Sequence, residues 1–160
     1  MVREIFIQER GKGNALNEGA RRAQGEVIAV ADASCVLCDG ALKIAVNHFE
    51  NEDVAAVGGR LLVIEEDWSL LEAIQSFEYM KSFQFSRRAL ARMNAQCLIS
   101  GAFGLFRKSD LLEIGGYDDY TVGEDMEVML RLQNDRVQRS DRRVIYEPDA
   151  ICETKVPHDF

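Results

Sequence analysis

Hydrophobic and polar positions along the chain follow two periods, one typical of strands and one typical of helices. Residues 27–31 read Val-Ile-Ala-Val-Ala, a short apolar run that predicts a strand buried on both faces of a parallel sheet. Residues 2–8 and 54–64 are rich in β-branched side chains, and residues 144–146 form a shorter run of the same kind. We predict that these three segments are also strands.

Apolar residues recur at three- and four-residue spacing in the other segments, which predicts helices. The predicted helices are residues 15–23, 39–49, 68–93, 108–114 and 124–133. Alternation of strands and helices is typical of an α/β protein. The first strand, helix and second strand fit the length of one crossover unit, about thirty residues.

Length, composition and charge narrow the class of protein. A chain of 160 residues, 47% hydrophobic and 29% charged, has the size and composition of one globular domain. Its 19 basic and 27 acidic residues give a formal net charge of −8, which argues against a nucleic-acid partner. The chain has neither a signal-peptide pattern nor an apolar run of roughly 18 residues, the length that crosses a bilayer. We therefore expect a cytoplasmic protein.

The chain has four cysteines, Cys35, Cys38, Cys97 and Cys152. Without an export signal they are expected to be reduced thiols. Cys35 and Cys38 have the Cys-x-x-Cys spacing of half a zinc site, but no second pair of ligands follows at similar spacing. A zinc-binding module is therefore an alternative that rests on one ligand pair alone.

Asp32 and Asp125 are the carboxylates most suited to chemistry. Asp32 follows the apolar run 27–31, at the end of a strand where α/β sheets bind ligands; alternatively, it simply begins a turn. Asp125 opens the helix at 124–133 and could be a general base, or it could stabilise the helix N-terminus. The helix dipole that favours its anionic form also lowers its basicity.

Basic residues suggest two further contacts. Lys12, in the turn before the first predicted helix, could bind a diphosphate near the helix N-terminus, or it could be a solvated surface lysine. Arg87, Arg88 and Arg92, near aromatic side chains, could contact an anionic membrane surface, or they could form a solvated helix end.

Seven segments, in their amino-acid sequences and in their order along the chain, resemble the family 2 glycosyltransferases. The resemblance is in particular to the membrane-associated branch that includes cellulose, chitin, hyaluronan and poly-N-acetylglucosamine synthases. These segments cover nearly the whole chain, and the stretch from Ile99 to Glu127 is the most specific. They are Gly11-Lys-Gly-Asn-Ala-Leu-Asn-Glu-Gly19, Val30-Ala-Asp-Ala-Ser34, Ile99-Ser-Gly-Ala-Phe-Gly-Leu-Phe-Arg107, Gly115-Gly-Tyr117, Val122-Gly-Glu-Asp-Met-Glu127, Tyr146-Glu-Pro-Asp-Ala150 and Thr154-Lys-Val-Pro157.

The resemblance implies a GT-A-like fold, a mixed sheet with flanking helices, and an inverting transfer from a nucleotide-diphosphate sugar, usually a uridine one. It implies a saccharide or lipid acceptor and a divalent cation, Mg²⁺ or Mn²⁺. It also implies roles for individual residues: Asp32 at the metal and the donor, Lys12 at the donor, Asp125 as the catalytic base, and Ser100, Gly101 and Glu124 at the acceptor.

Two departures from the family pattern shape the expectation. Where the family reads Asp-Ala-Asp, this chain reads Asp32-Ala33-Ser34, and a hydroxyl in place of a carboxylate should weaken metal binding. The family's nucleoside-binding strand and helix, its Gln-x-x-Arg-Trp motif and its transmembrane helices have no counterpart here. We therefore expect residues 1–160 to be a single partial catalytic domain, truncated at both ends, of a parent at the inner face of the cytoplasmic membrane.

The same departures leave a rival interpretation open. The chain could be a non-catalytic remnant that acts as a sugar- or protein-binding module. A sheet that lacks strands also exposes an unpaired apolar edge, which favours pairing with another chain. We therefore expect a homo-oligomer.

Overall fold

The fold is a mixed five-stranded sheet, seen in a computed structural model that describes residues 11–64, 74, 77, 90, 93, 99–118, 120–121, 123–139 and 142–155. The strand order is β1-β4-β3-β5-β2. β3 and β5 are parallel, and the other three pairs, β1 with β4, β4 with β3, and β5 with β2, are antiparallel. The strands are β1 (Val27–Ala31), β2 (Cys35–Leu37), β3 (Val54–Ile64), β4 (Phe103–Arg107) and β5 (Arg143–Lys155).

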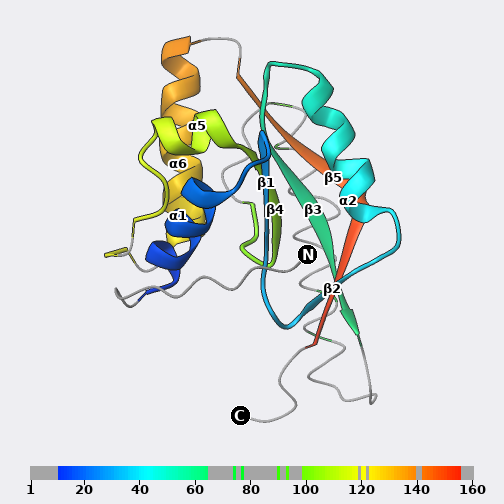
Figure 1. Ribbon diagram of the computed structural model, residues 1–160. Helices are drawn as coiled ribbons and strands as arrows, with labels where there is room; N and C mark the ends of the chain where they lie inside the picture. Colours follow the sequence, from blue (N-terminus) through cyan, green and yellow to red (C-terminus); the bar gives the residue numbers. More distant parts are fainter. Residues whose placement is uncertain are drawn as a thin grey trace.

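Helices cover both faces of this sheet. As Figure 1 shows, α1, α5 and α6 gather on one side and α2 lies on the other. The helices are α1 (Lys12–Arg22), α2 (Ala41–Asn47) with the 3₁₀ turn η1 (His48–Glu50), α5 (Lys108–Glu113) and α6 (Glu124–Arg139). Two buried clusters follow from this arrangement, one that includes Met129 and Val128 of α6 and one that includes Ala41 and Ala45 of α2.

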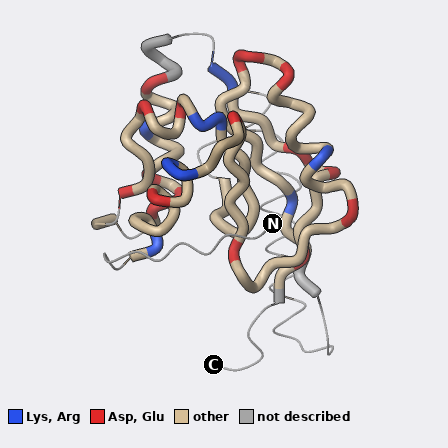
Figure 2. The backbone as a smooth tube through the Cα atoms, viewed as in Figure 1, with Lys and Arg blue, Asp and Glu red and all other residues tan. Residues whose placement is uncertain are grey.

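The interior strand β4 explains why the site residues are held firmly. Its first four residues, Phe103 to Phe106, are all buried, because β1 and β3 flank the strand and helices cover both faces. The turn before β4 is therefore anchored to an interior strand of the sheet. Figure 2 shows that basic and acidic residues are interspersed along the backbone in this view.

One strand is predicted at the right residues, but its predicted burial and its predicted parallel pairing are wrong. Residues 27–31 do form the strand β1, but its burial alternates, and Ala29 and Ala31 are exposed. Its partner β4 runs antiparallel, whereas the parallel pair is β3 with β5. Small alanine side chains made the run look continuously apolar, although only Ile28 and Val30 contribute to the buried cluster.

The last strand is longer than the apolar run 144–146 suggested. β5 continues through Pro148 because the register with β3 shifts between Gly59 and Arg60, and a proline is tolerated at such an irregularity. A Cβ on Gly59 would overlap the Phe103 ring, so the bulged backbone can approach β4 only at a glycine. The short strand β2 was not predicted.

Several predictions fall on residues outside the described part of the chain. These are the strand at 2–8, most of the helix at 68–93, Cys97, and the membrane contact of Arg87, Arg88 and Arg92. Ile74, Phe77 and Leu90 within that segment are helical. Within the described residues, no helix combines the length and the apolar character that crossing a membrane requires.

Candidate active site

Lys12 joins three segments that lie far apart in the sequence. Its ammonium Nζ lies 3.0 Å from Glu124 Oε1 at the start of α6 and 3.7 Å from Asp32 Oδ1 just after β1. Lys12 itself is the first residue of α1. The side chain is 44% exposed, as a surface lysine would be, and it also pairs with carboxylates from two other segments, so its contact with a diphosphate stays a prediction.

Asp125 turns toward the loop before β4. The backbone N–H of Gly101 donates a hydrogen bond to Asp125 Oδ2 over 2.8 Å. A Cβ on Gly101 would lie 2.8 Å from Asp125 Cγ and closer still to both carboxylate oxygens. The half-buried carboxylate therefore occupies the space that a side chain at residue 101 would need.

Asp32 begins a turn, and its carboxylate lies 3.7 Å from the Lys12 ammonium; its role at a ligand stays a prediction. Its carbonyl accepts a hydrogen bond from Cys35 N–H over 3.0 Å, which closes the turn. Its own N–H donates to Ala102 O over 3.3 Å, which links the end of β1 to the loop that carries Gly101. The Asp32 side chain is 43% exposed and is accessible to a ligand.

The carboxylates at the start of α6 have opposite pKa shifts. The hydrogen bond from Lys12 lowers the pKa of Glu124, so this residue stays ionised. Burial raises the pKa of Asp125; Lys12 and the Gly101 N–H oppose this rise, and the negative charges of Glu124 and Asp32 add to it. Burial is the largest influence on the Asp125 pKa, and it acts against the lower basicity expected at a helix N-terminus. Two carboxylates with separated pKa values can have different roles: the one with the lower pKa forms an ion pair, and the one with the higher pKa can accept a proton.

The pKa of Lys12 is raised above its ordinary value. Burial acts to lower it, but the hydrogen bond to Glu124 and the negative charges of Asp125 and Asp32 outweigh that effect. The ammonium is therefore firmly protonated at neutral pH and supplies a fixed positive charge among three carboxylates. A group with this charge could receive the oxygens of a diphosphate.

The other residues predicted for the site lie nearby in sequence but have different contacts. Ser100 Oγ accepts a hydrogen bond from Ala102 N–H over 3.3 Å, and thus stabilises the turn before β4. Ser34 is exposed within the turn that Asp32 begins. Within the described residues, no group of three or more acidic, cysteine or histidine side chains could hold a metal ion. Asp32 offers one accessible carboxylate, which suffices where substrate phosphates complete the coordination of Mg²⁺.

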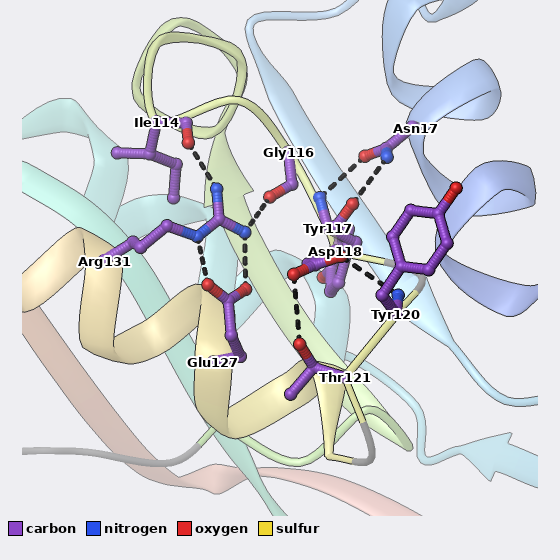
Figure 3. Close-up of polar contacts among 9 residues, drawn as sticks. All are labelled: Asn17, Ile114, Gly116, Tyr117, Asp118, Tyr120, Thr121, Glu127 and Arg131. Atoms are coloured by element: carbon purple, nitrogen blue, oxygen red, sulfur yellow. Dashed lines mark hydrogen bonds and ion pairs between the residues drawn. The ribbon is translucent and has the colours of Figure 1, made fainter.

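The structure brings together residues to which the sequence gave no role. Asn17 of α1 bonds to the backbone of Tyr117, and Arg131 of α6 bonds to the turn just before Tyr117, as Figure 3 shows. Asn17 and Tyr117 belong to two of the segments that carried the resemblance. Nothing in their types reveals that they meet, because 100 residues separate them.

The described cysteines are free thiols. Cys152 is buried, whereas Cys35 and Cys38 are half-buried near the turn that Asp32 begins. Burial, followed by the neighbouring Cys35 and Cys38, raises the pKa of Cys152 to about 12. The Cys152 thiol therefore stays protonated at neutral pH, and the zinc alternative gains no support from the described part of the chain.

Comparison with known proteins places this geometry in a family. The family model described as glycosyltransferase-like family 2 matches residues 2–160. The chain is 35% identical over 149 residues to a poly-beta-1,6-N-acetyl-D-glucosamine synthase of Staphylococcus epidermidis, covering 92% of this chain and 35% of the relative. It is 31% identical over 157 residues to the Staphylococcus aureus (strain COL) enzyme of the same name, covering 96% and 37%. The chain thus spans little more than a third of these relatives.

Solved structures agree on the fold. A mannosyltransferase, PcManGT from Pyrobaculum calidifontis, solved with GDP-Man and Mn²⁺, has a TM-score of 0.61 at 21% identity over 94% of this chain and 38% of its own. GalNAc-T7, solved with UDP, GalNAc and Mn²⁺, has a TM-score of 0.63 at 15% identity over 94% and 32%. The mixed sheet with flanking helices is accordingly a GT-A fold, as predicted. With the family model matching nearly every residue and relatives above 30% identity, the chain belongs to glycosyltransferase family 2.

Proposed function

We propose that this chain is part of an inverting glycosyltransferase that moves a hexosyl or N-acetylhexosaminyl group from a nucleotide-diphosphate sugar to a saccharide or lipid acceptor. The observation that carries the proposal is the grouping of Lys12, Asp32 and Glu124 beside Asp125, from segments remote in sequence. The relatives are named as synthases of an N-acetylglucosamine polymer, which favours polysaccharide or glycolipid synthesis.

Asp125 would act as the general base. Its carboxylate takes the proton of the acceptor hydroxyl while the hydroxyl oxygen bonds to the anomeric carbon. The bond from that carbon to the diphosphate breaks, its electron pair leaves with the nucleoside diphosphate, and the configuration at the anomeric carbon inverts. The raised pKa of Asp125 suits this role, because general bases work best with a pKa closer to the working pH.

Lys12 and Asp32 would serve the leaving diphosphate. The Lys12 ammonium would donate hydrogen bonds to phosphate oxygens, and Ser100, Gly101 and Glu124 would contact the acceptor. A divalent cation, Mg²⁺ or Mn²⁺, would be held by Asp32 and the donor phosphates and would neutralise charge on the departing group. Ser34 replaces a carboxylate with a hydroxyl, so we expect this cation to be weakly held without the donor.

The second candidate function is a non-catalytic sugar- or protein-binding module. The observation that favours it is Ser34, because the loss of one acidic ligand reduces the chain's own affinity for a metal. The two candidates differ in one measurable property. The metal-assisted transferase proposed here requires that nucleotide binding depend on the metal, whereas a sugar-binding module does not.

Asp32→Ala is expected to remove the metal dependence of nucleotide binding. Titration of uridine diphosphate with and without Mn²⁺ should show metal-enhanced affinity in the unmodified protein. Loss of the Asp32 carboxylate should weaken binding in the presence of Mn²⁺ by about tenfold, equal to ~1.4 kcal/mol. Asp39→Ala removes another exposed aspartate, at the turn before α2, and is the matched control. Equal affinity with and without Mn²⁺ in the unmodified protein would favour the binding module.

We further propose that the protein self-associates. Among the described strands, β1 lies at the edge of the sheet and pairs only with β4. Sedimentation velocity at several protein concentrations should show a dimer or a larger species, because an apolar edge strand invites pairing. A single monomeric species at all concentrations would contradict this. We also propose that the parent protein lies at the inner face of the cytoplasmic membrane.

A further inference from the structure

A polar clamp joins α1 to α6 on the side of the sheet that carries the candidate site. We define it by three residues, Asn17 of α1, Tyr117 of the intervening turn and Arg131 of α6 (Figure 3). The turn runs from Ile114 to Tyr117 and lies between the two helices. None of these contacts uses a side chain to which the proposed mechanism gives a role.

Asn17 holds both backbone groups of Tyr117. Its Nδ2 donates to Tyr117 O over 2.8 Å, and Tyr117 N–H donates to its Oδ1 over 2.7 Å. The preceding Gly116 has φ +74°, and a Cβ there would overlap the Asn17 amide. Glycine at position 116 therefore permits both the left-handed turn and the close approach of Asn17.

Arg131 holds the same turn from α6. Its guanidinium forms a fork with Glu127, with Nε to Oε1 at 2.5 Å and Nη2 to Oε2 at 2.6 Å. It also donates to Gly116 O over 2.5 Å and to Ile114 O. A planar guanidinium that makes several such bonds fixes its partners in one geometry. The turn is therefore tied to α1 on one side and to α6 on the other.

A second contact, at the candidate site, joins the same two helices, α1 and α6. Lys12 begins α1 and pairs with Glu124, which begins α6, over 3.0 Å. Asn17 lies five residues beyond Lys12 and Arg131 seven beyond Glu124, roughly 7 and 10 Å along each helix axis. The Lys12–Glu124 pair and the clamp together form a ring of contacts, so the separation of the helices at the clamp bears on their separation at the site.

We propose that Asn17 is a positioning residue: through Tyr117 and Arg131 it sets the spacing of α1 and α6, and so holds Lys12 against the carboxylates at the start of α6. This inference rests on the proposed transferase function for its catalytic consequence, but not for its structural one. Tyr117 is 5% exposed and packs edge-to-face on Phe106, with ring centroids 6.1 Å apart. Burial is the main cause of a raised pKa of its phenol, and the charges of Asp125 and Glu124 add to it.

The first experiment measures the ion-paired state of Lys12 without any need for catalysis. The full protein is treated with limiting acetic anhydride at fixed pH, and mass spectrometry gives the acetylation of Lys12 relative to the exposed Lys43. In Asn17→Ala the ratio should rise several-fold, because an ammonium released from its carboxylates deprotonates and reacts more readily. Asn17→Asp keeps the acceptor for Tyr117 N–H and should give a smaller rise.

Asn51→Ala is the matched control. Asn51 also accepts a backbone N–H with its side chain, from Asp53 over 2.9 Å, in an exposed loop away from the site. Its Lys12 to Lys43 ratio should match that of the unmodified protein. An unchanged ratio in Asn17→Ala, or an equal rise in both alanine variants, would overturn the proposal whatever the activity.

The second experiment separates positioning from binding. In transfer assays Asn17→Ala should lower kcat by about tenfold or more, since displacement of catalytic groups by about 1 Å costs up to 10²-fold. The affinity for uridine diphosphate, to which Lys12 is also proposed to contribute, should fall by less than kcat does, a split that general loss of folded protein does not produce. Part of kcat should return in Asn17→Asp. If the unmodified protein transfers no sugar but the acetylation ratio still rises in Asn17→Ala, the proposed function fails and the clamp stands. A kcat equal to that of the unmodified protein would reject the positioning role.

Discussion

Asp125→Asn is expected to lower kcat by about 10²–10⁴, the range typical of a lost general base. The amide has the same shape, and its oxygen can still accept the hydrogen bond from Gly101 N–H, so the site should keep its structure. It cannot accept the acceptor's proton. The measurement is the initial rate of sugar transfer at saturating donor and acceptor, together with the affinity for uridine diphosphate, which should change little.

The pH dependence supplies an independent check on this assignment. Because the base acts only when ionised and burial raises the pKa of Asp125, kcat/KM should fall on acidification at a higher pH than it would for an ordinary aspartate. This acidic limb should vanish in Asp125→Asn. Glu124→Gln is the contrasting variant: Glu124 has a lowered pKa and pairs with Lys12, so its loss should leave the limb in place. Persistence of the limb in Asp125→Asn would assign the base to another group.

The elements and the acidic positions could be predicted from the sequence because they depend on local pattern. The helix that begins at Glu124 follows from its amphipathic spacing, and Asp32 stands where an apolar run ends. The family resemblance then assigned the roles. The burial of β1 could not be predicted in the same way, since a run of small apolar residues looks alike whether one face or both are covered.

Contacts that depend on backbone paths lay beyond the sequence pattern. Asn17 and Tyr117 meet across 100 residues of chain, and an asparagine within a predicted helix gives no sign of its partner. The pKa of Asp125 likewise depended on burial behind the loop at Gly101, whereas the local pattern showed only a helix N-terminus. In both cases the sheet, which places the end of β1 beside the start of β4, determines which residues meet.

The glycine at position 101 links this backbone arrangement to the chemistry. Gly101→Ala is expected to reduce kcat by an amount similar to Asp125→Asn, because the new Cβ would overlap the carboxylate and displace it. Displacement of a base by about 1 Å costs up to about 10²-fold, and the displaced carboxylate would also lose its hydrogen bond from the N–H of residue 101. Gly19→Ala in α1 is the matched control, since a Cβ there meets nothing within 4 Å.

A double-variant cycle tests whether residues 101 and 125 act as one unit. If Gly101→Ala acts by moving the Asp125 carboxylate, it should cost much less in an Asp125→Asn background than alone, because contacting residues are not additive. The two losses should multiply if Gly101 instead contributes separately, through the acceptor sugar. Multiplication would assign Gly101 the acceptor contact that the family resemblance implies and would reject displacement of Asp125. Non-additive losses would show that the Asp125 carboxylate needs the space that a side chain at residue 101 would fill.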